Sequence, residues 1–191
     1  MKIASMSTLL AQAAAGVFGR GKIGKRLSTR YHVECHGPDG KLKWVDEFDN
    51  LVVTAGLDDS LDKHFKGSSY TAAWYVGLTD GTPTFDAADT MASHAGWVEV
   101  AAYDELVRQD LTLGSISGGS VSNSGDKAIF TISADSTTVG GCFISDGDAK
   151  ATDTGYNTGV LYGGGAFTGG DKVLSDGDLL SVTVTLTAAA A

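Results

Sequence analysis

Two overlapping glycine patterns near the N-terminus raise the question of nucleotide binding. Residues 16–22 spell G-x-x-x-x-G-K, the start of a phosphate-binding P-loop, and residues 19–24 spell G-x-G-x-x-G. A P-loop requires a strand before it, a helix after it, and Ser or Thr after the lysine to reach Mg²⁺. Here Ile23 follows the lysine, a helical pattern precedes the glycines, and strand patterns follow them. We therefore expect no nucleotide cofactor and interpret the glycines as a bendable linker.

One stretch combines imidazoles and a carboxylate in strand spacing. His32, Glu34 and His36 alternate along TRYHVECH, so an extended chain points all three side chains to one face. Two imidazoles and a carboxylate suit a transition metal. The two histidines, however, are four residues apart, roughly 13 Å on a strand, which is too far for one ion. We predict a solvated or interface face here, and no metal site.

The remaining polar clusters do not form a catalytic arrangement. Asp146, Asp148 and Asp153 share a glycine-containing loop but lack the ligand order and the final Glu of an EF-hand. The preferred interpretation is an acidic turn, with a weak Ca²⁺ site near Asp146 and Asp148 as the alternative. His64 and His94 are isolated, and no G-x-S-x-G elbow accompanies them. We predict a protein that is not an enzyme and has no cofactor.

The first 28 residues have the pattern of a separate N-terminal arm. Apolar residues recur there at three- and four-residue steps, which is typical of one face of an amphipathic helix. Only basic charges follow this stripe before the first acidic residue, Glu34. We expect the arm to be mobile until it binds a partner, because so short a helix is marginal in water. The residues expected to bind the partner are Ile3, Met6, Leu10, Val17, Arg20, Lys22, Lys25 and Arg26.

Charge and composition limit the possible partners. The chain of 191 residues has a net charge of −9, which argues against nucleic acid as a partner. No apolar run reaches the length of about 18 residues that a membrane span requires. The two cysteines, Cys35 and Cys142, lie in apolar strand-like segments and are expected to be free buried thiols. Two free buried thiols, in place of a disulfide framework, fit an intracellular or virion protein.

Strand patterns dominate the rest of the chain. Residues 29–48 form a predicted hairpin around the turn GPDG, and residues 57–65 form one short predicted helix. In residues 179–187, LLSVTVTLT, apolar and hydroxyl side chains alternate strictly, and KAIFTIS shows the same alternation. Many short strands with turn signals predict an all-β fold, an antiparallel β-sandwich of jelly-roll type. The expected parts are an arm (1–28), a sandwich body (29–187) and a short Ala tail (188–191).

Several longer stretches resemble one group of proteins. FDNLVVTAGL, WYVGLTDGTP and DTMASHAGWVEV, together with SGGSVSNSGDKAIFTI and the final strand, are similar to small structural proteins of tailed bacteriophages. Members of this group are labelled head decoration (cement) or tail fibre proteins. The resemblance covers roughly residues 30–187. It implies a virion protein with a β-rich body, assembled as a homotrimer, and no catalytic residues.

The arm and the absence of a shaft repeat favour one label over the other. A fibre needs length, whereas a compact body with an arm suits a capsid decoration protein that binds the major capsid protein and copies of itself. The alternative is a tail fibre or receptor-binding tail component, in which the loop 79–96 would contact the receptor. A second alternative, a carbohydrate-binding module, would require exposed aromatic residues in a groove.

Overall fold

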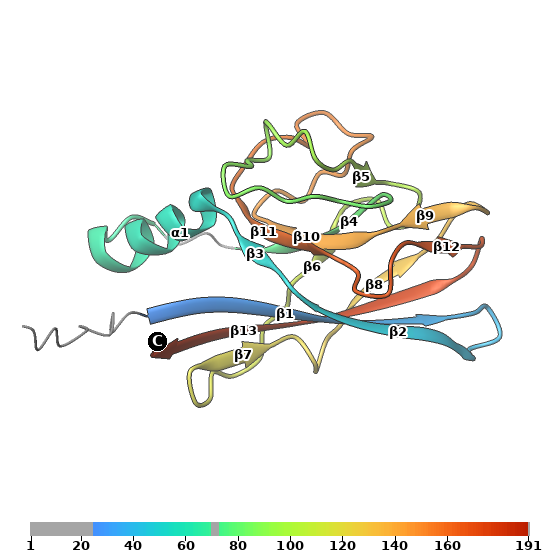
Figure 1. Ribbon diagram of the computed structural model, residues 1–191, viewed down its shortest axis with the longest axis horizontal. Coiled ribbons are helices and arrows are strands. Elements are labelled where there is room, and N and C mark those ends of the chain that lie inside the picture. Colours follow the sequence, from blue (N-terminus) through green and yellow to red (C-terminus); the bar gives the residue numbers. More distant parts are fainter. Residues whose placement is uncertain (1–24, 70–72, 191) are drawn as a thin grey trace, which may run out of the picture.

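The computed structural model describes residues 25–69 and 73–190, and it consists mainly of two antiparallel sheets that face each other (Figure 1). The predicted all-β sandwich is therefore confirmed. One α-helix, α1 (Thr54–Leu61), continues into a short π-helical turn, η2 (Asp62–Lys66). Within the described ranges, no helix is long and apolar enough to cross a membrane.

The first sheet is organised around its two longest strands. β1 and β13 are antiparallel and pair along their whole length, from Lys25 opposite Ala190 to His36 opposite Leu179. β2 forms a hairpin with β1, and β7 and β8 both pair with β13. Gly40, at a φ of 75°, closes the hairpin turn and donates its N–H to the carbonyl of Gly37 at 2.8 Å. The strands are β1 (Lys25–His36), β2 (Leu42–Asp49), β7 (Ser120–Ser122), β8 (Ala128–Thr131) and β13 (Leu179–Ala190).

The second sheet packs across the core from the first, in the order β3-β11-β10-β4-β5, with β6 also pairing with β4. Gly77 in β4 allows the ring of Phe143 to lie directly against the backbone, since a Cβ there would come within 2.2 Å of the ring. A separate ribbon pairs β9 with β12. These strands are β3 (Leu51–Val52), β4 (Tyr75–Thr79), β5 (Glu99–Val100), β6 (Gln109–Asp110), β9 (Thr137–Val139), β10 (Gly141–Ser145), β11 (Leu161–Ala166) and β12 (Lys172–Leu174).

The core between the sheets follows the predicted alternation. Leu180, Val182 and Val184 of β13 are fully buried, as is Phe130 of β8, whereas the intervening Ile129 is 45% exposed. Burying such aliphatic and aromatic side chains contributes about 1.5–3 kcal/mol each. The two cysteines are free and buried, as expected from their sequence context.

The ends of the body differ from the expected boundaries. β1 already begins at Lys25, and β13 continues to Ala190, so residues 25–28 and 188–190 belong to the first sheet. Backbone pairing decides this, because each of these residues has a cross-strand partner in the other strand. The helical region likewise begins at Thr54, three residues before the expected start.

Candidate functional site

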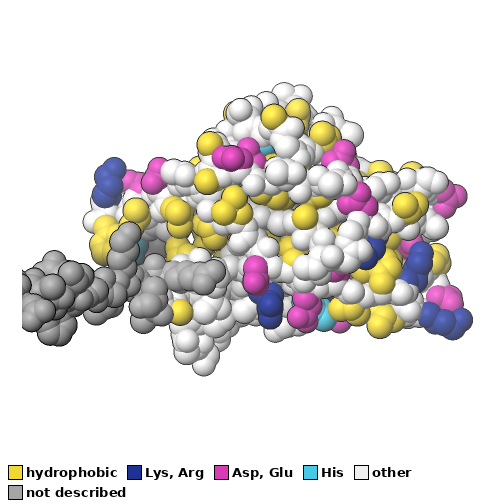
Figure 2. Space-filling view, viewed as in Figure 1, with side chains coloured by type: hydrophobic (Ala, Val, Ile, Leu, Met, Phe, Trp, Pro, Cys, Tyr) yellow, Lys and Arg dark blue, Asp and Glu magenta, His cyan; other side chains and the backbone are white. Residues whose placement is uncertain are grey.

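The helix α1 is held against the second sheet by a glycine, and its apolar face points away from the core. Gly56 is buried against β11, where a Cβ would lie 2.4 Å from the carbonyl oxygen of Tyr162. Leu57, Leu61 and Phe65 are spaced four residues apart and are 40%, 56% and 72% exposed. In Figure 2 hydrophobic side chains are visible at this end of the molecule, over α1. The helix therefore presents an apolar surface that the described body leaves uncovered.

Three adjoining hollows connect this helix face to the ends of β1 and β13. Their volumes are about 270, 370 and 230 Å³. The first and second hollows share Ser60, the first and third share Tyr162 and Leu186, and the second and third share Leu27 and Ala188. Because each hollow shares lining residues with both others, they form one continuous surface, which we call the arm-end groove.

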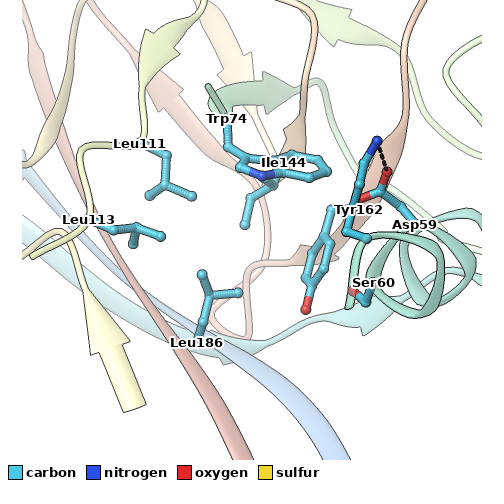
Figure 3. Close-up of a pocket in the computed structure, with 9 residues that line it drawn as sticks. Asp59, Ser60, Trp74, Leu111, Leu113, Ile144, Tyr162 and Leu186 are labelled. Atoms are coloured by element: carbon cyan, nitrogen blue, oxygen red, sulfur yellow. Dashed lines mark ion pairs between the residues drawn. The ribbon is translucent and has the colours of Figure 1, made fainter. Parts of the chain in front are cut away.

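The first hollow of the arm-end groove lies between the two sheets (Figure 3). Trp74 and Tyr162 meet there edge to face, with ring centroids 5.7 Å apart and an interplanar angle of 73°. The polar rim comes from α1 and η2, where Lys63 lies 3.7 Å from Asp59. The other side chains that line this part are mostly aliphatic and come from both sheets and the segment after β6: Leu111, Leu113, Ile144 and Leu186.

This lining bears on the carbohydrate-binding alternative. A sugar site needs a flat aromatic face together with several polar groups that fix the hydroxyls. The edge-to-face rings of Trp74 and Tyr162 form no shared flat platform, and aliphatic side chains surround them. The hollow is better matched to an apolar side chain than to a sugar.

Most of the sequence-predicted partner-binding residues lie outside the described residues. This applies to Ile3, Met6, Leu10, Val17, Arg20 and Lys22. Lys25 and Arg26 are described, and they occupy the first two positions of β1, opposite Ala190 and Ala189. The arm therefore joins the body beside the arm-end groove, since Leu27 and Ala188 line two of its hollows.

The histidine-containing strand face forms an ion-pair network. His32 lies between two carboxylates, with Nδ1 at 2.9 Å from Glu47 and Nε2 at 3.0 Å from Glu34. Hydrogen bonding to Glu47, and then to Glu34, raises the pKa of His32. Lys127 donates to the other oxygen of Glu34 at 3.0 Å. Among the described residues no group of three His, Cys, Asp or Glu side chains could hold a metal ion.

Two of the three loop aspartates accept hydrogen bonds from backbone N–H groups. Asp146 accepts a hydrogen bond from the N–H of Val160 at 2.6 Å, and Asp153 accepts one from the N–H of Lys150 at 3.3 Å. Asp146 and Asp153 thus serve different turns of the same loop. This geometry matches the acidic-turn interpretation of the sequence.

A buried ion pair that sequence reasoning missed lies beneath this loop. The guanidinium of Arg108 is inaccessible to solvent and makes two 2.8 Å hydrogen bonds to the carboxylate of Glu99. It also donates to Ser145 Oγ and to the carbonyls of Gly147 and Tyr156. Every contact is internal to the protein, so this cluster fastens the loop to the second sheet. Its residues are far apart in the sequence, and no local motif signals it.

The loop 79–96 is held against the second sheet by aromatic contacts. Trp97, just after it, stacks on His94 with ring centroids 3.7 Å apart and packs on Phe143 at 4.9 Å. The indole N–H of Trp97 donates to Asp89 at 3.2 Å, and Met91 is buried in the same cluster. Much of this loop therefore serves a second small core.

Comparison with known proteins adds no relative. No protein-family model matches the chain, and no curated protein matches its sequence.

Proposed function

We propose that this chain is a non-enzymatic structural protein of a tailed-bacteriophage virion, and that it decorates the outer surface of the capsid shell. The observation that carries the proposal is the arm-end groove. Exposed apolar side chains gather at the end of the sandwich from which the arm leaves (Figure 2). Extended exposed apolar patches mark protein–protein interaction sites, so this end of the molecule is the one suited to attach to a larger assembly.

The polar groups support a structural role. The most buried charged pair, Arg108 with Glu99, makes its hydrogen bonds to other groups of the protein. His32 is held by two carboxylates on an open strand face. Catalysis by these groups would require a nucleophile or an acid–base pair next to a site that encloses substrate. None of these three residues lines a hollow of the arm-end groove.

The division of charge supports the choice of a protein surface as partner. All the charged residues of the arm are basic, whereas the body from residue 29 onward has a large excess of acidic residues. Arg20 and Lys22 would meet acidic groups of the major capsid protein, and the apolar stripe of the arm would be buried beside them. Each copy bound across neighbouring shell subunits adds contacts that exist only in the assembled state, which stabilises the shell by mass action.

The outer face of the first sheet supports self-association, and the resemblance implies that the assembly is a homotrimer. Four exposed apolar side chains lie there, in two adjacent cross-strand rows. Leu42 and Leu179 lie in one row, and Val45 and Ile129 lie in the other. Val45 and Ile129 are each 45% exposed, and Leu42 is 56% exposed. Burial of such a patch against a second copy favours oligomers. Light scattering on the purified protein at micromolar concentration should give three times the chain mass, and a strict monomer would contradict this part of the proposal.

Labelling intact particles tests the proposal as a whole. Gold-conjugated antibodies against the body, applied to tailed-phage particles released from cells that make this protein, should label the heads at many positions. Label on the tails only would favour the fibre alternative, and no label on any particle would reject a virion role. Full-length protein with Arg20→Glu and Lys22→Glu should bind depleted shells more weakly and with less salt dependence. The matched control, Lys41→Glu in the exposed hairpin turn, should bind like the wild type.

A further inference from the structure

The arm-end groove has the mainly apolar lining of a site for an amphipathic helix. Its walls come from the exposed face of α1 and η2 on one side and from the ends of β1 and β13 on the other. We propose that in the unassembled protein this groove binds the chain's own N-terminal segment, residues 3–17, in place of the mobile arm that the sequence alone led us to expect. The proposal concerns the free protein and goes beyond attachment to a shell.

The position of the chain entry supports this occupant. Residue 24 directly precedes β1, whose third residue, Leu27, lines two of the three hollows. Residues 18–24 form a linker of seven residues that includes Gly19, Gly21 and Gly24. Such a linker spans up to about 23 Å when extended, and its glycines allow the chain to reverse direction. A helix over residues 3–17 would be about 22 Å long and can therefore fold back over the groove next to its own attachment point.

The chemistry of the two surfaces is complementary. The predicted stripe of Ile3, Met6 and Leu10 would cover Leu61 and Phe65, which are otherwise mostly exposed. Helix-in-groove binding uses this arrangement of anchors at three- and four-residue steps. α1 and η2 carry three carboxylates and two lysines, and Asp59 and Asp62 already pair with Lys63 and Lys66. These elements therefore keep a net charge of only −1, whereas residues 1–24 contain three basic residues and no acidic one.

The segment of the same chain is favoured over that of a second copy. A short flexible linker holds its segment at an effective concentration in the millimolar range, far above the concentration of other copies in a micromolar solution. Seating the arm in this way would also cover the apolar face of α1 before assembly. If the proposed function holds, the capsid surface competes with the groove for the arm.

Hydrogen exchange on the full-length protein, without any particles, tests this inference. Amides of residues 3–17 should exchange at least about tenfold more slowly than in an unstructured peptide of the same sequence. The double substitution Leu61→Gln and Phe65→Gln removes two exposed anchors and should abolish most of this protection. The control is Val98→Gln with Val173→Gln, at side chains that are 60% and 67% exposed. Val98 directly precedes β5 and Val173 lies in β12, and both strands lie away from α1 (Figure 1). This control should leave the protection of residues 3–17 unchanged.

Three results would overturn the inference. Exchange of residues 3–17 at the unstructured rate in the wild type would show that the groove does not hold them. Protection that survives the Leu61→Gln and Phe65→Gln substitutions would place the segment elsewhere. Protection that disappears on dilution below micromolar concentration would assign the groove to a second copy. Because these measurements use free protein, their failure would leave the labelling of virions, and thus the proposed function, to be judged separately.

Discussion

Replacement of Arg108 by methionine would test the buried ion pair most directly. The substitution keeps much of the side-chain volume and removes the guanidinium that holds Glu99 with two 2.8 Å hydrogen bonds. Glu99 is 8% exposed, so its carboxylate would remain buried without a partner. The carbonyls of Gly147 and Tyr156 would lose a donor as well.

The expected cost is large compared with the stability of a domain of this size. Removing one partner of a buried ion pair costs about 3–5 kcal/mol, and the free energy of unfolding of a domain is about 5–15 kcal/mol. Urea denaturation at pH 8 should therefore show a loss of about 3–5 kcal/mol for Arg108→Met. The matched control is Arg30→Met, which breaks the exposed pair with Asp49 at 3.2 Å. That control should lie within about 1 kcal/mol of the wild type.

The pH dependence gives the same prediction a second, independent readout. Burial raises the pKa of Glu99, and Arg108 opposes that rise. Without Arg108 the pKa of Glu99 in the folded state should rise further, whereas the pKa in the unfolded chain stays at its ordinary value. At pH values between the two pKa values, Glu99 is protonated in the folded state and ionised in the unfolded chain. The variant therefore gains stability as the pH falls and loses it as the pH rises. Its deficit should therefore be smaller at pH 5 than at pH 8. A deficit below about 1 kcal/mol at pH 8, or one that grows as the pH falls, would refute this account of the cluster.

Three further measurements test other parts of the fold. Val184→Asp places a charge at a fully buried position and should cost several kcal/mol in denaturant unfolding; an unchanged midpoint would mean that the register of β13 is wrong. The hydrogen bond to Glu47 raises the pKa of His32, so Glu47→Gln should lower that pKa in an NMR titration. The stability that this pair contributes should be present below the ordinary histidine pKa and lost as the pH rises through the raised one. Burial raises the pKa of Cys35 to about 11 and also raises that of Cys142. Neither thiol should therefore react with a disulfide reagent at pH 8 until the protein unfolds. Fast labelling of the native protein would contradict the burial of the two cysteines.

The sequence alone determined the fold class and the facing of its most regular strands. In residues 179–187 the strict alternation placed Leu180, Val182, Val184 and Leu186 on the core face. The first three are fully buried, and Leu186 is partly buried against the same core. This inference works because a strand turns successive side chains to opposite faces, so burial on one face leaves a period of two in the sequence. The free cysteines and the hairpin around GPDG were predictable for similarly local reasons.

Local pattern failed at residues 97–100, where contacts with other segments decide which side chains are buried. WVEVAAY suggests that Val98 and Val100 share a face opposite Trp97 and Glu99. In the structure, Trp97, Glu99 and Val100 are all buried, and Val98 is 60% exposed. Glu99 is buried because it forms an ion pair with the buried Arg108. Trp97 is buried because Phe85 and His94 of the preceding loop stack on its ring. Neither contact can be inferred from spacing along the chain.

One part of the candidate site could be predicted from the sequence, and the other part depended on the tertiary structure. The apolar stripe and basic residues of the arm could be identified from the sequence, because helical periodicity and charge are local properties. The arm-end groove could not, because its walls come from β1, α1, β11 and β13, which are far apart in the chain. Periodicity also grouped Leu57, Leu61 and Phe65 on one face of a helix without showing which face would pack inward. The close approach of Gly56 to the backbone of Tyr162 decided that orientation, since only a side without a Cβ allows the helix to lie so near the strand.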